Sequence, residues 1–70
     1  MKRQRVISSS IRSVGYDSAN QIMEIEFQSG GIYCYYGVPR EVYQELLNAP
    51  SKGRYFEANV RGTYRYARAA

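Results

Sequence analysis

The feature that most constrains this chain of 70 residues is a β-hairpin predicted over residues 21–39, QIMEIEFQSGGIYCYYGVP. In its first strand, Met23, Ile25 and Phe27 alternate with polar residues, so the three apolar side chains point to one face. That face must be covered by other segments. We expect the strand before the hairpin and the helices after it to pack there and form the core.

The length of the hairpin loop decides which tyrosines enter the core. A two-residue loop would place Tyr33 and Tyr35 on the open face of the hairpin. A three-residue loop over residues 28–30 reverses the parity, turning Tyr33 and Tyr35 inward and Cys34 and Tyr36 outward. A type I turn with glycine in the left-handed region suits Gln-Ser-Gly better than a type I′ turn does. We therefore expect the longer loop, which weakens the alternative that Tyr33 and Tyr35 form a platform for stacking bases.

Two helices are predicted after the hairpin. Proline suits the first helical position, which predicts a helix over residues 39–49. Ser51 is a good N-cap for a second helix over residues 52–61, with Gly62 as its C-terminal cap. Gly53 lies early in that helix and predicts a close approach to the first helix or the sheet.

The remaining segments complete an α+β fold. β-branched residues predict a first strand over residues 10–16, preceded by a mobile basic tail at residues 1–5. Residues 63–67 predict a short extra strand or an ordered arm. The expected architecture is a single domain over residues 1–70, in which two short helices pack on one face of a three-stranded antiparallel β-meander.

Residue usage favours a soluble cytoplasmic protein. The single cysteine, Cys34, excludes an internal disulfide and favours a reducing compartment. The chain has no histidine, and one cysteine cannot build a structural zinc site. No apolar run approaches the roughly 20 residues of a membrane span, and none follows the basic N-terminus as in a signal peptide.

Few residues could support catalysis. Cys34 has no histidine in the chain to activate it. Glu24 and Glu26 stand two residues apart on a strand, which favours solvated surface charges over a glycosidase pair. The two glycines at positions 30 and 31 belong to the hairpin turn, not to a phosphate-binding loop. We therefore expect a protein that is not an enzyme and holds no cofactor or metal.

Positive charge gathers at both ends of the chain, around an acidic middle. The net charge is +4, and eight of the ten cations are arginine, which bonds phosphate bidentately and stacks on bases. The candidate nucleic-acid-binding patch consists of Lys52, Arg54, Arg61, Tyr64, Arg65, Tyr66 and Arg68. Its arginines would meet phosphates while Tyr64 or Tyr66 stacks a base, for ~1–3 kcal/mol. Alternatively, Tyr64 closes the core, Tyr66 covers a sheet edge and the arginines are solvated.

A set of short motifs resembles the KTSC domain, a small module found alone in bacteria and phages and at the C-terminus of some lysyl-tRNA synthetases. The motifs, in order, are Ser8-Ser9-Ser10-Ile11, Val14-Gly15-Tyr16-Asp17, Phe27, Gly30, Tyr33-x-Tyr35, Val38-Pro39, Val42-Tyr43, Leu46, Ala49-x-Ser51-x-Gly53, Phe56, Arg61 and Tyr64. Glu57 departs from the family, which tends to have asparagine there. The resemblance implies an α+β domain and RNA binding, with RNA ahead of DNA.

A protein-interaction module that uses an exposed sheet edge or a tyrosine-rich surface is the competing function. An edge of a three-stranded sheet can pair with a partner strand or a second copy, and residues 8–10 are a plausible edge. An acidic outer surface made of Glu24, Glu26 and Glu41 would fit a protein partner better than it fits nucleic acid.

Overall fold

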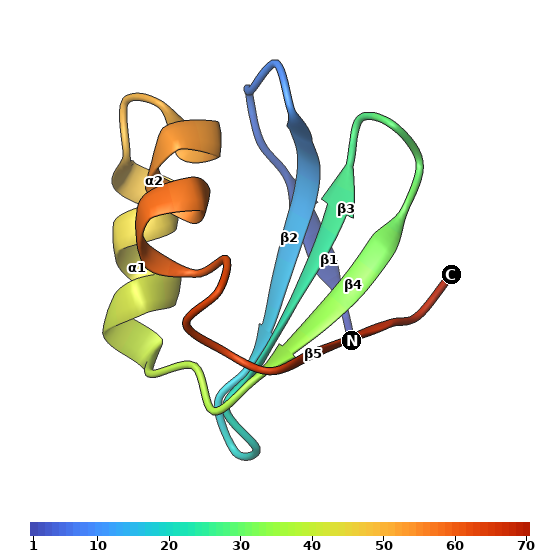
Figure 1. Ribbon diagram of the computed structural model, residues 1–70, viewed down its shortest axis with the longest axis vertical. Helices are drawn as coiled ribbons and strands as arrows, with labels where there is room; N and C mark the ends of the chain where they lie inside the picture. Colours follow the sequence, from blue (N-terminus) through green and yellow to red (C-terminus); the bar gives the residue numbers. More distant parts are fainter.

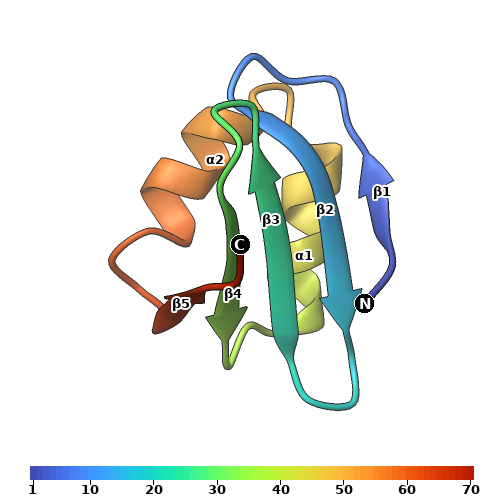
Figure 2. The same cartoon turned by 90° about the vertical axis from the view of Figure 1, so that its right-hand side faces the viewer.

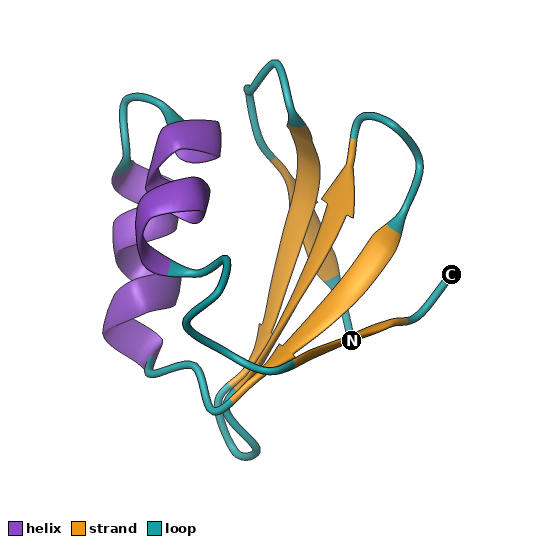
Figure 3. Ribbon diagram, in the orientation of Figure 1, coloured by secondary structure: helices purple, strands orange, loops and turns teal.

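The computed structural model describes residues 1–70, whose strands and helices form two layers (Figure 1 and Figure 3). An antiparallel sheet in chain order consists of β1 (Arg3–Arg5), β2 (Ile11–Asp17), β3 (Ile22–Phe27), β4 (Ile32–Tyr36) and β5 (Tyr66–Arg68). Helices α1 (Arg40–Asn48) and α2 (Lys52–Asn59) both lie on one face of the sheet. Figure 2 looks onto the opposite face, which no helix covers. The predicted α+β fold with both helices on one face is confirmed.

The hairpin of β3 and β4 turns through three residues. The Phe27 N–H donates to the Gly31 carbonyl at 2.9 Å, and Gly30 takes a φ of 108° in the left-handed region that glycine favours. Tyr33 and Tyr35 consequently pair with core-facing residues of β3. Tyr35 is 5% exposed. The prediction that both tyrosines turn inward is confirmed.

The prediction of three strands is wrong, because the two ends of the chain extend the sheet on both sides. Arg3–Arg5 were expected in a mobile tail but form β1, which pairs with β2. The Arg3 guanidinium lies 2.8 Å from a Glu24 carboxylate oxygen and donates to the Ser13 hydroxyl at 2.9 Å. At the other edge β5 pairs with β4, so the C-terminal segment takes the strand alternative, shifted to Tyr66–Arg68.

α2 begins after Ser51 as predicted, whereas α1 is one residue shorter at each end than predicted, with Pro39 as its N-cap and not its first residue. The Ser51 hydroxyl accepts a hydrogen bond from the Arg54 N–H at 3.3 Å to cap α2. α2 ends at Asn59, two residues before the predicted end, and the chain then reverses through Gly62, whose φ is 79°. The C-cap of α2 is Val60, so Gly62 is not the predicted cap but lies two residues beyond it, in the turn that follows the helix.

Nine buried apolar residues fill the space between the layers. They are Ile11, Val14, Met23, Ile25, Tyr35, Val38, Leu46, Phe56 and Val60. Phe27, expected in the core, is half-buried and packs against this cluster. Both helices thus dock through a few large side chains, as is usual for so small a core.

Gly53 brings the start of α2 against the loop before β2. A Cβ at this position would lie 2.5 Å from the Ser10 hydroxyl oxygen. The predicted close approach is therefore real, although its partner is the β1–β2 loop and not α1. This contact fixes how far the first turn of α2 stands from the end of the sheet.

Phe56→Ala should unfold the protein or cost ~3–5 kcal/mol of unfolding free energy, because Phe56 is 4% exposed and fills the space between α2 and the sheet. Urea denaturation measures the loss. Ile7→Ala is the control, since Ile7 is 97% exposed and its truncation should change stability by less than about 0.5 kcal/mol. A melt of Phe56→Ala that matches the wild type would contradict this description of the core.

Arg3→Ala should cost about 1–2 kcal/mol of unfolding free energy, because Glu24 and Ser13 lose their charged partner. Arg5→Ala, which removes an exposed guanidinium from the same strand, should leave stability near that of the wild type. Equal urea midpoints for the two variants would show that β1 is not held by Arg3.

Candidate functional site

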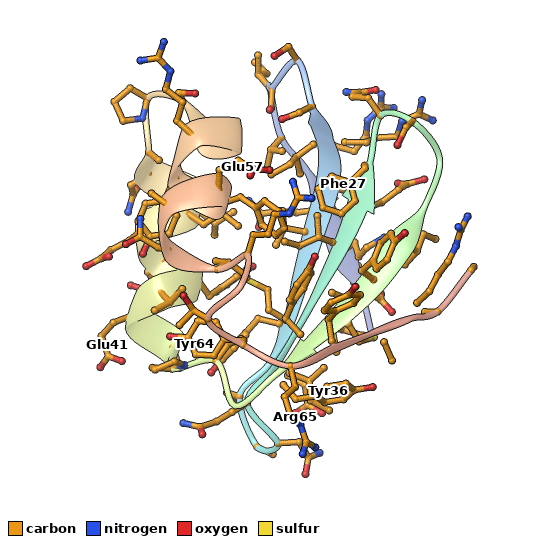
Figure 4. All side chains as sticks on the ribbon, in the orientation of Figure 1. Phe27, Tyr36, Glu41, Glu57, Tyr64 and Arg65 are labelled. Carbon is orange, nitrogen blue, oxygen red and sulfur yellow. The ribbon has the colours of Figure 1, made fainter.

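A cleft of about 920 Å³ opens between α2 and the strands β3, β4 and β5. Its floor and walls are mainly aromatic, and its rim is polar. The aromatic wall is formed by Phe27, Tyr33, Tyr35, Phe56 and Tyr66. In Figure 4, Glu57 on α2 and Phe27 on β3 lie across from one another at one end of this cleft. The cleft combines flat apolar surface with charged groups from a facing helix.

The rings of the aromatic wall hold each other in place through edge contacts. The ring of Phe56 meets those of Phe27 and Tyr35 edge-on, with centroids 5.2 and 5.4 Å apart. The Tyr66 ring leans on Tyr33 and Tyr35 at 5.8 and 5.7 Å. Tyr66 is nevertheless 62% exposed, so much of its ring is free for another flat group to stack on.

The polar rim brings two arginines, one glutamate and several serines to the cleft. Arg54, Glu57 and Arg61 come from α2 and the turn after it, and the rim serines are Ser9, Ser10, Ser29 and Ser51. Arg61 Nη1 lies 3.1 and 3.2 Å from the two Glu57 carboxylate oxygens. Because both side chains of this pair are more than half exposed (69% and 57%), it contributes little to stability and Arg61 remains available to a ligand.

The structure divides the predicted seven-residue patch. Arg54, Arg61 and Tyr66 line the cleft. Arg68 lies beside it, with its guanidinium carbon 5.7 Å from the centre of the Tyr33 ring, a cation–π contact.

The other three members of the patch lie elsewhere. The Lys52 ammonium donates to the Ala49 carbonyl at 3.1 Å, at the end of α1. Tyr64 is half-buried and packs against the core, as the alternative interpretation held. Arg65 lies beside Tyr36 (Figure 4), and both line a second hollow together with Tyr64 and Tyr66. Tyr66 borders both this hollow and the cleft, whereas Tyr64 and Arg65 border the hollow alone.

Sequence reasoning missed the aromatic wall because it assigned the inward tyrosines to the core alone. Tyr33 is half-buried and Tyr35 almost wholly so, yet both border the cleft. Glu57 was also missed as a site residue. Its spacing from Arg61, four residues along a helix, was the signal that could have placed the two together.

The open face of the sheet carries a bonded polar cluster. The prediction that Glu24 and Glu26 are solvated charges is wrong. Their side chains are only 15% and 23% exposed, and both contact Arg3. The Ser13 hydroxyl donates to Glu26 at 2.9 Å, and the Cys34 thiol lies 3.6 Å from Glu24. Burial, and then the Glu24 charge, raise the pKa of Cys34, which makes it a poorer nucleophile.

The structure also removes two surfaces on which the protein-interaction alternative depended. Residues 8–10 do not form a sheet edge, because β1 covers β2 and Ser8 instead accepts hydrogen bonds from the backbone of its own loop. Glu41 lies on α1, on the opposite side of the sheet from Glu24 and Glu26. The three glutamates therefore share no common surface.

Neither a metal site nor a membrane-spanning helix is found among residues 1–70. No cluster of three or more His, Cys, Asp or Glu side chains has the arrangement of a metal site. Neither helix has the length and apolarity that crossing a bilayer requires.

Comparison with known proteins places almost the whole chain in one family. The model of the KTSC domain matches residues 7–64. An uncharacterised protein of Stutzerimonas stutzeri is 52% identical over 69 residues, which are 97% of each chain. The crystal structure of a KTSC domain protein from Yersinia pestis has a TM-score of 0.96 and 40% identity, covering 99% of this chain and 97% of that one.

A longer relative carries the same module as a small part. The lysine–tRNA ligase of Trichormus variabilis is 45% identical over 58 residues, which are 83% of this chain but 10% of the ligase. All cleft residues except Tyr66 fall within the stretch matched by the family model. The cleft is thus built mainly from the part of the chain that the family shares.

Alkaline pH should destabilise the protein through Tyr35. Burial, and then the neighbouring Tyr66, raise the pKa of Tyr35 from 10.0 to about 12. The folded state therefore holds this proton more tightly than the unfolded chain, and the associated stability is complete below pH 10 and is lost as pH rises toward about 12.

Tyr35→Phe should weaken that dependence. Urea midpoints measured from about pH 9 to pH 11.5 should fall less steeply for the variant than for the wild type. Tyr55 should continue to contribute in both, because burial and its hydrogen bond to Glu45 raise its pKa to about 12 as well. Identical slopes would show that the Tyr35 phenol is not the group responsible.

Proposed function

This chain belongs to the KTSC domain family, and we propose that it is a non-enzymatic module that binds single-stranded nucleic acid, RNA in preference to DNA, in the cytoplasm. The observation that carries the proposal is the aromatic cleft with Arg54 and Arg61 at its rim. Proteins that bind single-stranded nucleic acids combine flat rings with arginine, because bases stack on the rings while the phosphates contact the positive charge.

Stacking has an accessible ring at the cleft. Tyr66 is 62% exposed and supported from behind by Tyr33 and Tyr35. A base stacked on such a ring gains ~1–3 kcal/mol, with little dependence on which base it is. A supported ring also loses little conformational freedom when it binds, because its position is already fixed.

Positive charge is available on both sides of that ring. Arg54 is exposed on α2, Arg61 is held only by a weak surface ion pair, and Arg68 stands over Tyr33. The acidic side chains of Glu24 and Glu26 lie on the opposite face of the sheet, where Arg3 compensates them. The charges near the cleft therefore favour an anionic ligand more than the net charge alone indicates.

Two observations favour RNA over DNA. The rim serines Ser9, Ser10 and Ser51 offer hydroxyl groups that can bond a ribose 2′-OH. The family module also occurs in a relative named for its action on a transfer RNA. Lys52 has no direct part in this binding mode, because its ammonium bonds the end of α1, and Tyr64 and Arg65 line the second hollow and not the cleft.

A protein partner is the competing function. The sheet still has two edges, β1 and β5, but each is only three residues long. Short edges are poor templates for strand addition. The most exposed tyrosine, Tyr66, stands at the cleft, so a protein partner that binds a tyrosine-rich surface would compete with the proposed nucleic acid.

The double variant Arg54→Glu with Arg61→Glu should abolish binding to a short single-stranded RNA, measured by fluorescence anisotropy. Its matched control is Arg5→Glu with Arg40→Glu, which changes the net charge equally at exposed sites on β1 and α1. The control should lose about tenfold or less, because only long-range attraction weakens.

The salt dependence of wild-type affinity provides an independent check. A site that neutralises two or three phosphates should give a slope of log affinity against log salt of about −1.4 to −2. Equal losses of RNA affinity in the two double variants would show that RNA binds through the overall positive charge and not at the cleft. Affinity indifferent to salt and to both variants would favour the protein-partner class.

A further inference from the structure

Glu57 is the only carboxylate that lines the cleft. A carboxylate at a site for nucleic acid repels phosphate, so it weakens binding unless it contacts another part of the ligand. Bases, unlike phosphates, carry N–H donors that an ionised carboxylate can accept. Glu57 is therefore better suited to a base than to the backbone.

Arg61 occupies the edge between the two Glu57 carboxylate oxygens. Because the pair is exposed and weak, a base with two adjacent N–H donors can take that edge while Arg61 moves to its side. Arg61 Nη1 contacts both oxygens, at 3.2 and 3.1 Å, from one helical turn further along the chain. A carboxylate offers about four lone-pair sites, so further acceptor positions remain. Arg61 likewise keeps donors beyond this nitrogen, because a guanidinium carries five N–H groups. The pair thus presents the Arg61 guanidinium as a donor beside the two acceptor oxygens of Glu57, whose side chain is 57% exposed.

Only one of the four RNA bases has the complementary edge. Guanine presents, in order, the O6 acceptor, the N1–H donor and the N2–H donor. Adenine and cytosine each present a single amino donor next to a ring-nitrogen acceptor, which would face a carboxylate oxygen unfavourably. Uracil places its N–H between two carbonyls and offers no second donor.

We infer that Glu57 and Arg61 read the Watson–Crick edge of a guanine that enters the cleft, with the two Glu57 oxygens accepting from N1–H and N2–H and Arg61 donating to O6. The base lies against the aromatic wall, where Tyr66 provides the exposed ring. Arg54 and Arg68 remain for the flanking phosphates. This inference rests on the proposed function and adds the base that the cleft selects.

The test compares the affinities of short single-stranded RNAs of sequence UUNUU, in which N is guanine, adenine, cytosine, uracil or hypoxanthine. Wild-type protein should prefer guanine over the other three standard bases by about tenfold or more. Hypoxanthine keeps O6 and N1–H but lacks the 2-amino group, so its RNA should bind more weakly than the guanine RNA and more tightly than the others.

Glu57→Gln should reduce the guanine preference to about threefold or less, because one acceptor becomes a donor that faces N–H. The glutamine should at the same time improve binding of adenine or cytosine, whose edges pair one donor with one acceptor. Glu41→Gln on α1 is the matched control, and it should retain the wild-type preference. Both changes are on exposed positions, and thermal melts should confirm that both variants fold.

Each outcome of the affinity comparison either supports or overturns the inference that Glu57 and Arg61 read guanine. Equal affinities for all five RNAs, or a guanine preference that survives Glu57→Gln, would overturn the reading of guanine while leaving RNA binding intact. Absence of binding to every RNA would overturn the proposed function and this inference with it. A preference that disappears in Glu57→Gln and persists in Glu41→Gln would establish the role of Glu57.

Discussion

The register of the β3–β4 hairpin is the constraint on which the rest of this structure depends. Three residues in its loop, with Gly30 in the left-handed region, put Tyr33 and Tyr35 on the side that faces the helices. A loop shorter by one residue would reverse every side chain of β4. Cys34 and Tyr36 would then point inward, α2 would lose the ring on which Phe56 packs, and no aromatic cleft would form.

The cleft lies between an anchored α2 and the chain that returns along β4. Phe56 fixes the helix to the sheet, and Gly53 lets its first turn approach the Ser10 hydroxyl closely. The chain then leaves at Gly62 and returns along β4 as β5, which brings Tyr66 to the other side of the opening. The same contacts that hold the fold together therefore place rings and arginines around one hollow.

Much of the fold could be predicted from the sequence, because strong local signals agreed with it. Ser51 marked the start of α2, and the alternation of β3 identified its buried face. The number of strands could not be predicted in this way. β1 has little intrinsic strand signal, and what orders Arg3 is a long-range ion pair with Glu24, which no local pattern reveals.

The candidate site was predicted only in part, for a related reason. Clustering of arginine and tyrosine near the C-terminus found Arg54, Arg61 and Tyr66, but spacing along the chain could not show that Arg65 lies outside the cleft and that Lys52 bonds the end of α1. The aromatic wall was overlooked because a tyrosine that faces the core was assumed to belong wholly to it. Tyr33 shows that a side chain can pack on the core and still border a cleft.

An amide chemical-shift titration of the labelled protein with a short single-stranded RNA, at low and near-physiological salt, tests the central claim most directly. Binding in the cleft predicts shifts gathered on α2 and the turn after it, on Tyr33–Tyr35 and on Tyr66–Arg68, with the residues of the open sheet face that surround Glu24 unchanged. These shifts should diminish as salt rises. Shifts that centre on β1 and the open face, or that spread evenly over every basic residue, would contradict a cleft built to receive a base.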